Sequence, residues 1–364
     1  MTVKKQKILI ALSGGVDSST TAALLKKQGF ECTAVFMKLW GITNPVGLKR
    51  AKASCRVLGI PLQVVDFRRV FKKQVVDSFI DDYGRGLTPN PCVVCNQEIK
   101  FGWLFDYMKD GKFDCLATGH YVNNVFLNKS YHLTTAKDLT KDQSYFLYRL
   151  TQKQLKKLIF PLGGVTKNEV RKLAAEFKLP TASAKDSQEI CFIENQDYRS
   201  FLKTKLKNMI IPGQLVDGQK RVIGSHQGLP LYTIGQRHGF TLTSSLQSPV
   251  SKLIPPFYVI GKDIVKNQLM VGFGRETEQK GFFIEKPSWV NQEPKTRRLL
   301  VRVRYQGKLL DCRLERENKD LWRVRLDESV RGVAPGQSAV FYRPFVLKGE
   351  KTNEVIGGGL VSLR

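Results

Sequence analysis

The sequence predicts an α/β protein: an N-terminal domain built on a parallel sheet, followed by two small β-rich domains, a central one and a C-terminal β-barrel. Two observations lead to this fold class. In the first part of the chain, apolar strand patterns alternate with helical patterns, which is typical of parallel sheets with helices on both faces. After about residue 208 the chain becomes rich in Gly and Pro, and its apolar stretches become short. We therefore expect domains at residues 1–207, 208–280 and 281–364 of the 364-residue chain.

Apolar runs and capping patterns define the elements of the first domain. Four runs have the length and composition of buried strands, at residues 7–12, 33–37, 62–67 and 115–118. Helical patterns occupy residues 16–28 and 48–58, between the first three of these runs. Residues 151–205 are also expected to be helical, because Thr166 and Glu169 have the spacing of a capping box.

The last part of the chain carries short stretches of alternating apolar and polar residues, such as FYVI, QLMVGF, LLVRVRY and WRVRL. Such stretches are typical of antiparallel strands in small barrels or sandwiches. Arg302, Arg304 and Tyr305 alternate with apolar residues there, so they are predicted to share one face of a strand. That face is either a basic and aromatic surface for RNA or an ordinary solvated surface.

Charge and composition narrow the class of protein. With 59 Lys and Arg against 32 Asp and Glu, the formal net charge is +27, which favours a polyanionic partner such as nucleic acid. No apolar run is long enough to cross a bilayer, and the apolar stretch after the basic N-terminus is too short for a signal peptide. Seven cysteines at scattered spacing indicate a reducing compartment, so we expect a cytoplasmic protein with no membrane partner.

The segment Ser-Gly-Gly-Val-Asp-Ser-Ser at residues 13–19 follows a buried strand and opens a helix. A helix start of this kind offers backbone N–H groups and a favourable dipole to an anion, and Gly14 and Gly15 allow a phosphate to approach the backbone closely. Asp17 would repel a phosphate, so a Mg²⁺ bridge is its natural role. The alternative is a tight turn in which Ser and Asp act only as caps. The chain has neither a Walker A loop nor a G-x-G-x-x-G fingerprint.

This loop resembles the signature of the ATP pyrophosphatase (PP-loop) family, whose fold is the adenine nucleotide alpha-hydrolase-like parallel sheet. The resemblance implies that ATP is split between its α- and β-phosphates while a substrate oxygen is adenylated. A nucleophile then displaces AMP. The loop alone does not identify the nucleophile, because lysidine synthetase, NAD synthetase, GMP synthetase and the RNA thiolases share it.

Three cysteines are candidates for the nucleophile. Cys92 and Cys95 lie in Thr-Pro-Asn-Pro-Cys-Val-Val-Cys-Asn, a rigid entry into a predicted helix, where a thiol is expected to have a lowered pKa. They could instead be packing residues or half of a zinc site, although no second C-x-x-C is present. Cys191 precedes Phe-Ile and, taken alone, is more typical of a core residue.

Several further motifs occur in a fixed order: TPNP-x-x-x-CN, ATGHY, KDQSYFL, KDS-x-x-ICFI and PGQSAVFY. With the loop, they closely resemble the bacterial and organellar tRNA-specific 2-thiouridylase family over essentially the whole chain. The resemblance implies an ATP- and Mg²⁺-dependent sulfurtransferase that replaces the C2 oxygen of the wobble uridine (U34) of tRNA with sulfur. It implies a persulfide on Cys191 and a catalytic partner role for Cys95, which frees the sulfur or closes a disulfide.

The same resemblance implies two sets of binding residues. Those for ATP are Ala11, Leu12, Ser13, Gly14, Gly15, Val16, Asp17, Ser18, Met37 and Gly119. Those for tRNA are Asn90, Pro91, Cys92, His120, Lys141, Asp142, Gln143, Arg304, Tyr305 and Gln337. The expected partners are tRNAs of the Lys, Glu and Gln type and a sulfur-relay protein or cysteine desulfurase as donor.

The chain departs from the family pattern at three places. Cys92 stands where the family often has an acidic residue, so Cys92, Cys95 and Cys191 could hold a [4Fe–4S] cluster with one open iron. Residues 38–42 lack an acidic run common in the family, and Asn123 replaces an Arg. Two other hypotheses for the function stay open. The chain is another PP-loop tRNA-modifying enzyme such as lysidine synthetase, or it is an RNA-binding or iron–sulfur protein whose ATP loop is idle.

Overall fold

The first domain is a five-stranded parallel sheet covered by helices. The computed structural model describes residues 5–41, 45–184, 190–193, 197–243 and 255–362. The sheet has the strand order β3-β2-β1-β4-β7, and its strands are β1 (Lys7–Ala11), β2 (Glu31–Lys38), β3 (Leu62–Asp66), β4 (Cys115–Ala117) and β7 (Leu158–Ile159). The central strand β1 is fully buried at Ile8, Leu9 and Ile10, as its continuous apolar run predicts.

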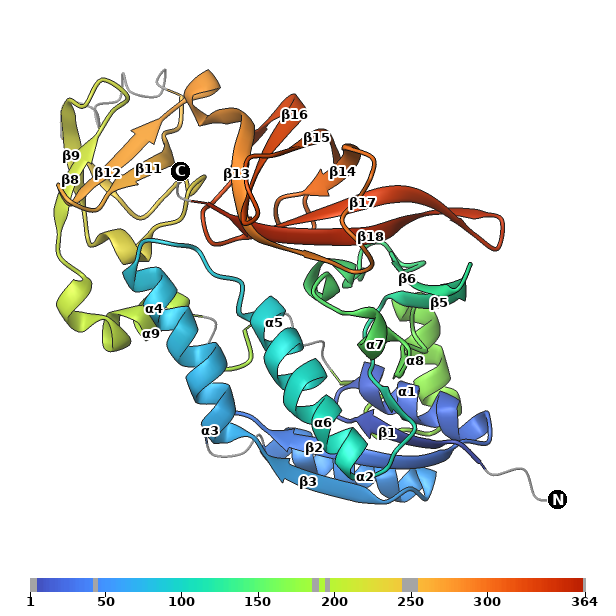
Figure 1. Cartoon of the computed structure of the whole chain (residues 1–364). Helices are drawn as coiled ribbons and strands as arrows, with labels where there is room; N and C mark the ends of the chain where they lie inside the picture. Colours follow the sequence, from blue (N-terminus) through green and yellow to red (C-terminus); the bar gives the residue numbers. More distant parts are fainter. Residues whose placement is uncertain (1–4, 42–44, 185–189, 194–196, 244–254, 363–364) are drawn as a thin grey trace.

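Helices flank this sheet and two long helical columns leave it. The helices are α1 (Val16–Lys27), α2 (Pro45–Leu58), α3 (Arg68–Phe71), α4 (Ser78–Gly84), α5 (Pro91–Val94), α6 (Leu104–Asp110), α7 (Gln152–Leu155), α8 (Lys167–Glu176) and α9 (Tyr198–Lys205). Two π-helical segments, η1 (Lys72–Asp77) and η2 (Cys95–Trp103), join α3 to α4 and α5 to α6. Figure 1 shows these two columns running from the sheet toward the β-rich domains.

The prediction of a helical stretch over residues 151–205 is only partly correct. The structure places α7, α8 and α9 there, but β7 and irregular segments separate them. Pro161, Gly163 and Gly164 follow β7 and disfavour a helix at that point. The capping box on α8 is confirmed, because the Thr166 side chain accepts from the Glu169 N–H and the Glu169 side chain accepts from the Thr166 N–H.

The central domain is a five-stranded sheet with the order β10-β9-β8-β12-β11. Its strands are β8 (Gly213–Val216), β9 (Val222–His226), β10 (Thr241–Leu242), β11 (Tyr258–Asp263) and β12 (Gln268–Gly272). Its apolar residues, including Leu215, Val259 and Val271, share one core with α4 and α9. The central domain is therefore anchored on the helical column α3–α4.

The last domain is a closed antiparallel barrel. Its strands are β13 (Glu278–Trp289), β14 (Arg298–Arg302), β15 (Leu310–Arg316), β16 (Leu321–Arg331), β17 (Ser338–Leu347) and β18 (Glu350–Val361), and pairing of β13 with both β16 and β18 closes it. A hairpin of the first domain, β5 (Asn123–Leu127) and β6 (Ser130–Thr134), continues the sheet beside β18. The predicted fold class is confirmed, and Figure 1 shows the barrel and central domain together at one end.

Candidate active site

The PP-loop connects β1 to α1 at the carboxyl end of the sheet. Gly14 has a φ of +81°, and a Cβ there would lie 2.1 Å from the Gly47 carbonyl oxygen, so only glycine fits. The Ser18 hydroxyl accepts from the Ser13 N–H at 3.2 Å and donates to the Gly15 carbonyl at 3.1 Å. Among the described residues, no side chain caps the first turn of α1. Its backbone N–H groups have the arrangement that the sequence predicts for an anion site, and the binding of an anion there stays a prediction.

The other predicted ATP residues converge on this loop because their strands are neighbours. Met37 lies near the end of β2 and Gly119 lies just after β4, and both strands pair with β1. A Cβ on Gly119 would lie 2.9 Å from the Asp17 carbonyl carbon and 2.9 Å from the Ser18 nitrogen. Gly119 therefore allows the β4 end to pack directly on the loop, at the edge where α/β sheets bind ligands.

Asp17 is held by two residues that the sequence analysis did not single out for it. The Lys167 ammonium contacts both Asp17 carboxylate oxygens, at 2.7 and 2.8 Å, and the Tyr121 hydroxyl donates to Oδ1 at 2.6 Å. Lys167 is the first residue of α8, and only 8% of its surface is exposed. The predicted role of Asp17 as a magnesium ligand stays a prediction.

The three candidate cysteines meet in one place. Cys92 lies in α5 and Cys95 opens η2, whereas Cys191 comes from a segment almost a hundred residues later. Cys95 and Cys92 both raise the pKa of Cys191 through their charges, which requires the three sulfur atoms to lie within electrostatic reach. All three are free thiols, with Cys95 buried and the other two exposed. The structure therefore brings the three thiols into one region, and the closer approach that disulfide exchange needs stays a prediction.

The predicted lowering of the thiol pKa is wrong. Burial raises the pKa of Cys95 to about 11 and that of Cys191 to about 12, and it also raises the pKa of Cys92. Protein surrounds much of each side chain, so the loss of hydration outweighs the favourable field of a helix start. The ammonium of Lys100 acts in the opposite direction on all three thiols.

Phe192 anchors the segment that carries Cys191. It is 2% exposed, and its ring packs against those of Phe71 and Phe79 at centroid distances of 5.9 and 5.3 Å and against Trp40 at 6.1 Å. Burial of one large aromatic side chain stabilises such a contact by roughly 1.5–3 kcal/mol. The apolar pattern that is typical of a core residue therefore reflects the burial of Phe192, and Cys191 itself stays accessible.

His120 lies between Lys100, whose charge acts on the three thiols, and Gly119, which packs on the PP-loop. It follows Gly119 directly, and its ring accepts a hydrogen bond from Lys100 Nζ at 3.3 Å while Nδ1 donates to the Thr118 hydroxyl at 2.7 Å. Burial and the Lys100 charge hold the pKa of His120 well below its usual range, so the ring is neutral. His120 is only 7% exposed, so its ring contacts Lys100 and offers little surface to an external ligand.

The barrel holds the segment that precedes Cys92. The Gln337 side chain donates to the Thr88 carbonyl at 2.8 Å, and the Thr88 N–H donates to the Pro335 carbonyl at 2.8 Å. The Asn90 side chain caps α5 by accepting from the Val93 N–H at 3.4 Å. Three predicted tRNA residues, Asn90, Pro91 and Gln337, are therefore brought together, and their contact with RNA stays a prediction.

The remaining predicted tRNA residues divide into a buried and a more accessible group. Asp142 is 2% exposed and pairs with Arg302 at 3.1 Å, so Arg302 points to the first domain rather than to a shared RNA-facing surface. Gln143 accepts from the Tyr121 N–H at 3.0 Å. Arg304 is exposed. Tyr305, which is half-buried, packs on Phe146 at a centroid distance of 4.4 Å, and Lys141 is also half-buried.

Sequence reasoning missed Lys100, Lys167 and Tyr121 as members of this site. Lys100 lies five residues after Cys95 on η2, and the i to i+5 geometry of a π-helix places such residues near one face. No pattern in the sequence announces that helix type. Lys167 is recognisable only as the residue after a helix cap, and its partner Asp17 lies 150 residues away.

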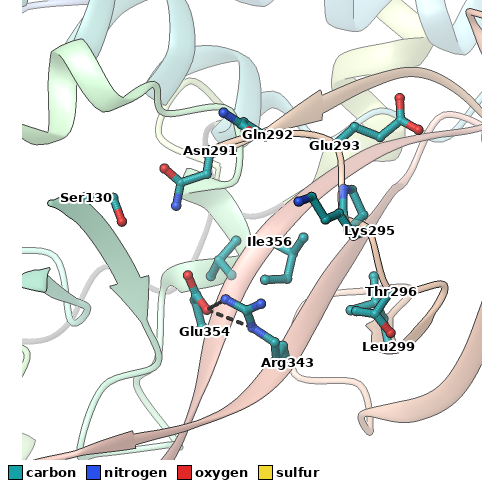
Figure 2. Close-up of a pocket in the computed structure, with 12 residues that line it drawn as sticks. Ser130, Asn291, Gln292, Glu293, Lys295, Thr296, Leu299, Arg343, Glu354 and Ile356 are labelled. Carbon is teal, nitrogen blue, oxygen red and sulfur yellow. Dashed lines mark hydrogen bonds and ion pairs between the residues drawn. The ribbon is translucent and has the colours of Figure 1, made fainter. Parts of the chain in front are cut away.

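A separate cavity lies between the barrel and the first domain (Figure 2). Its volume is about 520 Å³, and Figure 2 shows Arg343 and Glu354 pointing toward each other in its wall, where they form an ion pair. The PP-loop and the three thiols do not line it. The lining residues are Ser130, Asn291, Gln292, Glu293, Pro294, Lys295, Thr296, Leu299, Arg343, Glu354, Val355 and Ile356.

Comparison with known proteins identifies the family. Three family models match in succession: a tRNA methyl transferase HUP domain at residues 6–195, a tRNA methyl transferase PRC-barrel domain at 199–273 and an aminomethyltransferase β-barrel domain at 279–361. The tRNA-specific 2-thiouridylase MnmA of Chloroflexus aurantiacus is 40% identical over 369 residues, which cover 98% of each chain. The chain belongs to the tRNA-specific 2-thiouridylase family. A relative of the same name from Carboxydothermus hydrogenoformans is 38% identical and covers 100% of this chain and 99% of its own.

Solved structures show weaker similarity. The U34-tRNA thiolase NcsA of Methanococcus maripaludis, determined with its [4Fe–4S] cluster, aligns at 22% identity with a TM-score of 0.36, over 57% of this chain and 67% of that chain. No helix among the described residues is long and apolar enough to cross a membrane.

Proposed function

We propose that this member of the 2-thiouridylase family is an ATP-dependent tRNA-uridine 2-sulfurtransferase acting on the wobble uridine. The observation that supports the proposal is that Cys95 and Cys191, 96 residues apart in the sequence, lie within electrostatic reach of each other, since the thiol chemistry needs both sulfur atoms in one region. Family membership over the full length agrees with it. Family membership also disfavours the two alternatives, that the chain is a lysidine synthetase or an RNA-binding protein whose ATP loop is idle.

The first step is adenylation. The uracil C2 oxygen is a poor leaving group and must first be activated. It attacks the α-phosphorus of ATP, pyrophosphate leaves, and the adenylated oxygen can then depart as AMP. The open first turn of α1 and the residues of the loop, with Met37 and Gly119 at the neighbouring strand ends, bind the nucleotide. Magnesium bound with ATP would be held by Asp17 and would neutralise phosphate charge.

The second step transfers sulfur. The terminal sulfur of a Cys191 persulfide attacks C2 and AMP leaves, which joins the base to Cys191 through two sulfur atoms. The Cys95 thiolate then attacks the Cys191 sulfur, so a Cys95–Cys191 disulfide forms and the base departs with its C2=S group. An external thiol reductant restores both cysteines, and a sulfur-relay protein or cysteine desulfurase supplies the next persulfide.

The base reaches these groups only if it leaves the anticodon stack. Asn90, Pro91 and Cys92 would line the pocket for the flipped uridine, next to the two catalytic thiols. The net charge of +27 supplies phosphate contacts, and the exposed Arg304 with the half-buried Tyr305 offers a cation and an aromatic ring. The expected substrates are tRNAs of the Lys, Glu and Gln type in the cytosol, where thiols stay reduced.

A [4Fe–4S] cluster does not fit the residues as they are placed. Within the described parts of the chain, no group of three or more His, Cys, Asp or Glu side chains is arranged to hold a metal ion. We therefore derive no step through a cluster. Iron and acid-labile sulfide measured on anaerobically purified protein test this disagreement directly.

Nucleoside mass spectrometry tests the proposed function. Unmodified tRNA with a wobble uridine is incubated with the protein, ATP, Mg²⁺ and a persulfide donor, and then digested. We expect 2-thiouridine that requires ATP and disappears in Cys191→Ser, whereas Cys55→Ala, in the buried part of α2, retains the activity. AMP release without any thionucleoside would point instead to another PP-loop reaction.

A further inference from the structure

The PP-loop lacks the positive charge that its proposed ligand requires. Residues 12–19 contain no Lys or Arg, although the pyrophosphate part of ATP carries several negative charges. A Walker A loop meets this need with its own lysine. Within the described parts of the chain, a cation reaches the loop from another element, because Lys167 Nζ lies 2.7 Å from Asp17 Oδ1.

Lys167 is held firmly in this position. Its backbone N–H donates to Asp138 Oδ2 at 3.0 Å, and it follows the Thr166 cap of α8. Helix α8 packs on α1 through a shared core that includes Val170 and Ala174. The lysine backbone is therefore fixed relative to the loop by two independent contacts, and only the end of its side chain remains adjustable.

The surroundings of the ammonium are suited to an exchange of anions. Lys167 is only 8% exposed and lies 5.8 Å from the centre of the Tyr121 ring, whose hydroxyl also bonds to Asp17. A buried ammonium is costly without an anionic partner. Asp17 is that partner here, and its side chain keeps 34% of its surface exposed, on a loop whose helix start is uncapped.

We propose that Lys167 is the pyrophosphate-binding cation of the ATP site. It pairs with Asp17 when no nucleotide is bound and passes to the β- and γ-phosphates when ATP binds, so that it is never left unpaired. The exchange frees the Asp17 carboxylate for the cation that accompanies ATP. This inference rests on the proposed function only in that the loop binds ATP.

Equilibrium binding of inorganic pyrophosphate and of ATP, without and with Mg²⁺, tests the role by calorimetry on the full chain. Lys167→Met is expected to weaken Mg²⁺-free pyrophosphate binding by roughly 10- to 100-fold, the loss of one charge-assisted hydrogen bond. Lys167→Arg is expected to restore most of it. Lys172→Met, on the exposed face of the same helix, is the matched control and should bind as the wild type does.

Asp17→Asn separates direct binding from mere support of the loop. If Lys167 binds pyrophosphate, removing its competitor keeps or strengthens Mg²⁺-free binding, whereas a structural ion pair would make Asp17→Asn fail as Lys167→Met does. The double variant leaves no unpaired charge, so it should fold and still bind pyrophosphate weakly. Wild-type affinity in folded Lys167→Met or in the double variant would overturn the proposal, as would loss of binding in Asp17→Asn. Wild-type protein that binds no ATP would instead overturn the proposed function.

Discussion

Asp142 offers a sharp test of how the barrel is attached to the first domain. Its carboxylate accepts from the Ala136 N–H at 3.2 Å, from the Ser144 hydroxyl at 2.8 Å and from Arg302 at 3.1 Å. The side chains of Asp142 and Arg302 are only 1% and 12% exposed. The Ser144 N–H also donates to the Asp142 carboxylate at 3.2 Å, so replacing Asp142 with Ala leaves a buried guanidinium and three donor groups of the first domain without this partner.

The expected loss of stability follows from these contacts. Breaking a buried pair by removing one partner costs about 3–5 kcal/mol, and each unsatisfied donor adds about 1–3 kcal/mol that is not fully additive. The Arg302 guanidinium keeps its contact with the Tyr342 ring at 5.3 Å, so this contribution is the same in both proteins. We expect Asp142→Ala to lower the free energy of unfolding by at least about 3 kcal/mol.

Urea unfolding followed by tryptophan fluorescence measures this change, because Trp289 and Trp322 lie in the barrel. Asp327→Asn removes a partner from a solvent-exposed pair on the same barrel and should leave the midpoint nearly unchanged. A loss below about 1 kcal/mol for Asp142→Ala would refute the reasoning. Full stability with a large loss of tRNA affinity would show instead that Asp142 contacts the RNA directly.

Three further predictions concern the loop and the thiols. Gly14→Ala should abolish ATP binding in calorimetry, because its Cβ would meet the Gly47 carbonyl at 2.1 Å, whereas Gly164→Ala, with nothing within 4 Å, should bind normally. Asp17→Ala should stop AMP formation in a thin-layer assay while tRNA binding in a filter assay stays nearly intact; collapse of both would contradict the assignment. Because a raised pKa, about 12 for Cys191, leaves little thiolate, its alkylation rate should rise about tenfold per pH unit from 7 to 10. A rate that levels off between pH 9 and 10 in peptide mass spectrometry would show that the thiol ionises normally.

The parallel sheet could be predicted because most of its strands have a recognisable local sequence pattern. Residues 8–10 form a continuous apolar run that is buried on both faces, and the strand and helix spacing leaves few other topologies. Strand β7, by contrast, is two residues long, too short for any periodicity. The β5–β6 hairpin turns at Asn128 and Lys129, which both have positive φ, and only the Asn hints at such a turn.

The site divides in the same way. The loop and the cysteine segments were recognisable because their residue types and order are local. The state of the thiols was not, because the pKa of Cys95 and Cys191 depends on how much protein surrounds them after folding. Likewise, the partners of Asp17 and Asp142 lie 150 and 160 residues away, and charge in the sequence does not say which pairs form.

The contacts between the barrel and the first domain offer a route by which RNA bound to the barrel would act on the segment before the cysteines. Gln337, which is predicted to contact tRNA, donates its amide N–H groups to the Thr88 and Pro89 carbonyls. These two residues directly precede Asn90, the cap of α5. The Tyr145 hydroxyl donates to the Ser338 carbonyl at 2.7 Å, one residue further along the barrel strand. A tRNA that pulled on this barrel edge would therefore move the start of the helix that carries Cys95. RNA binding at this barrel edge and the position of Cys95 would then have one physical link.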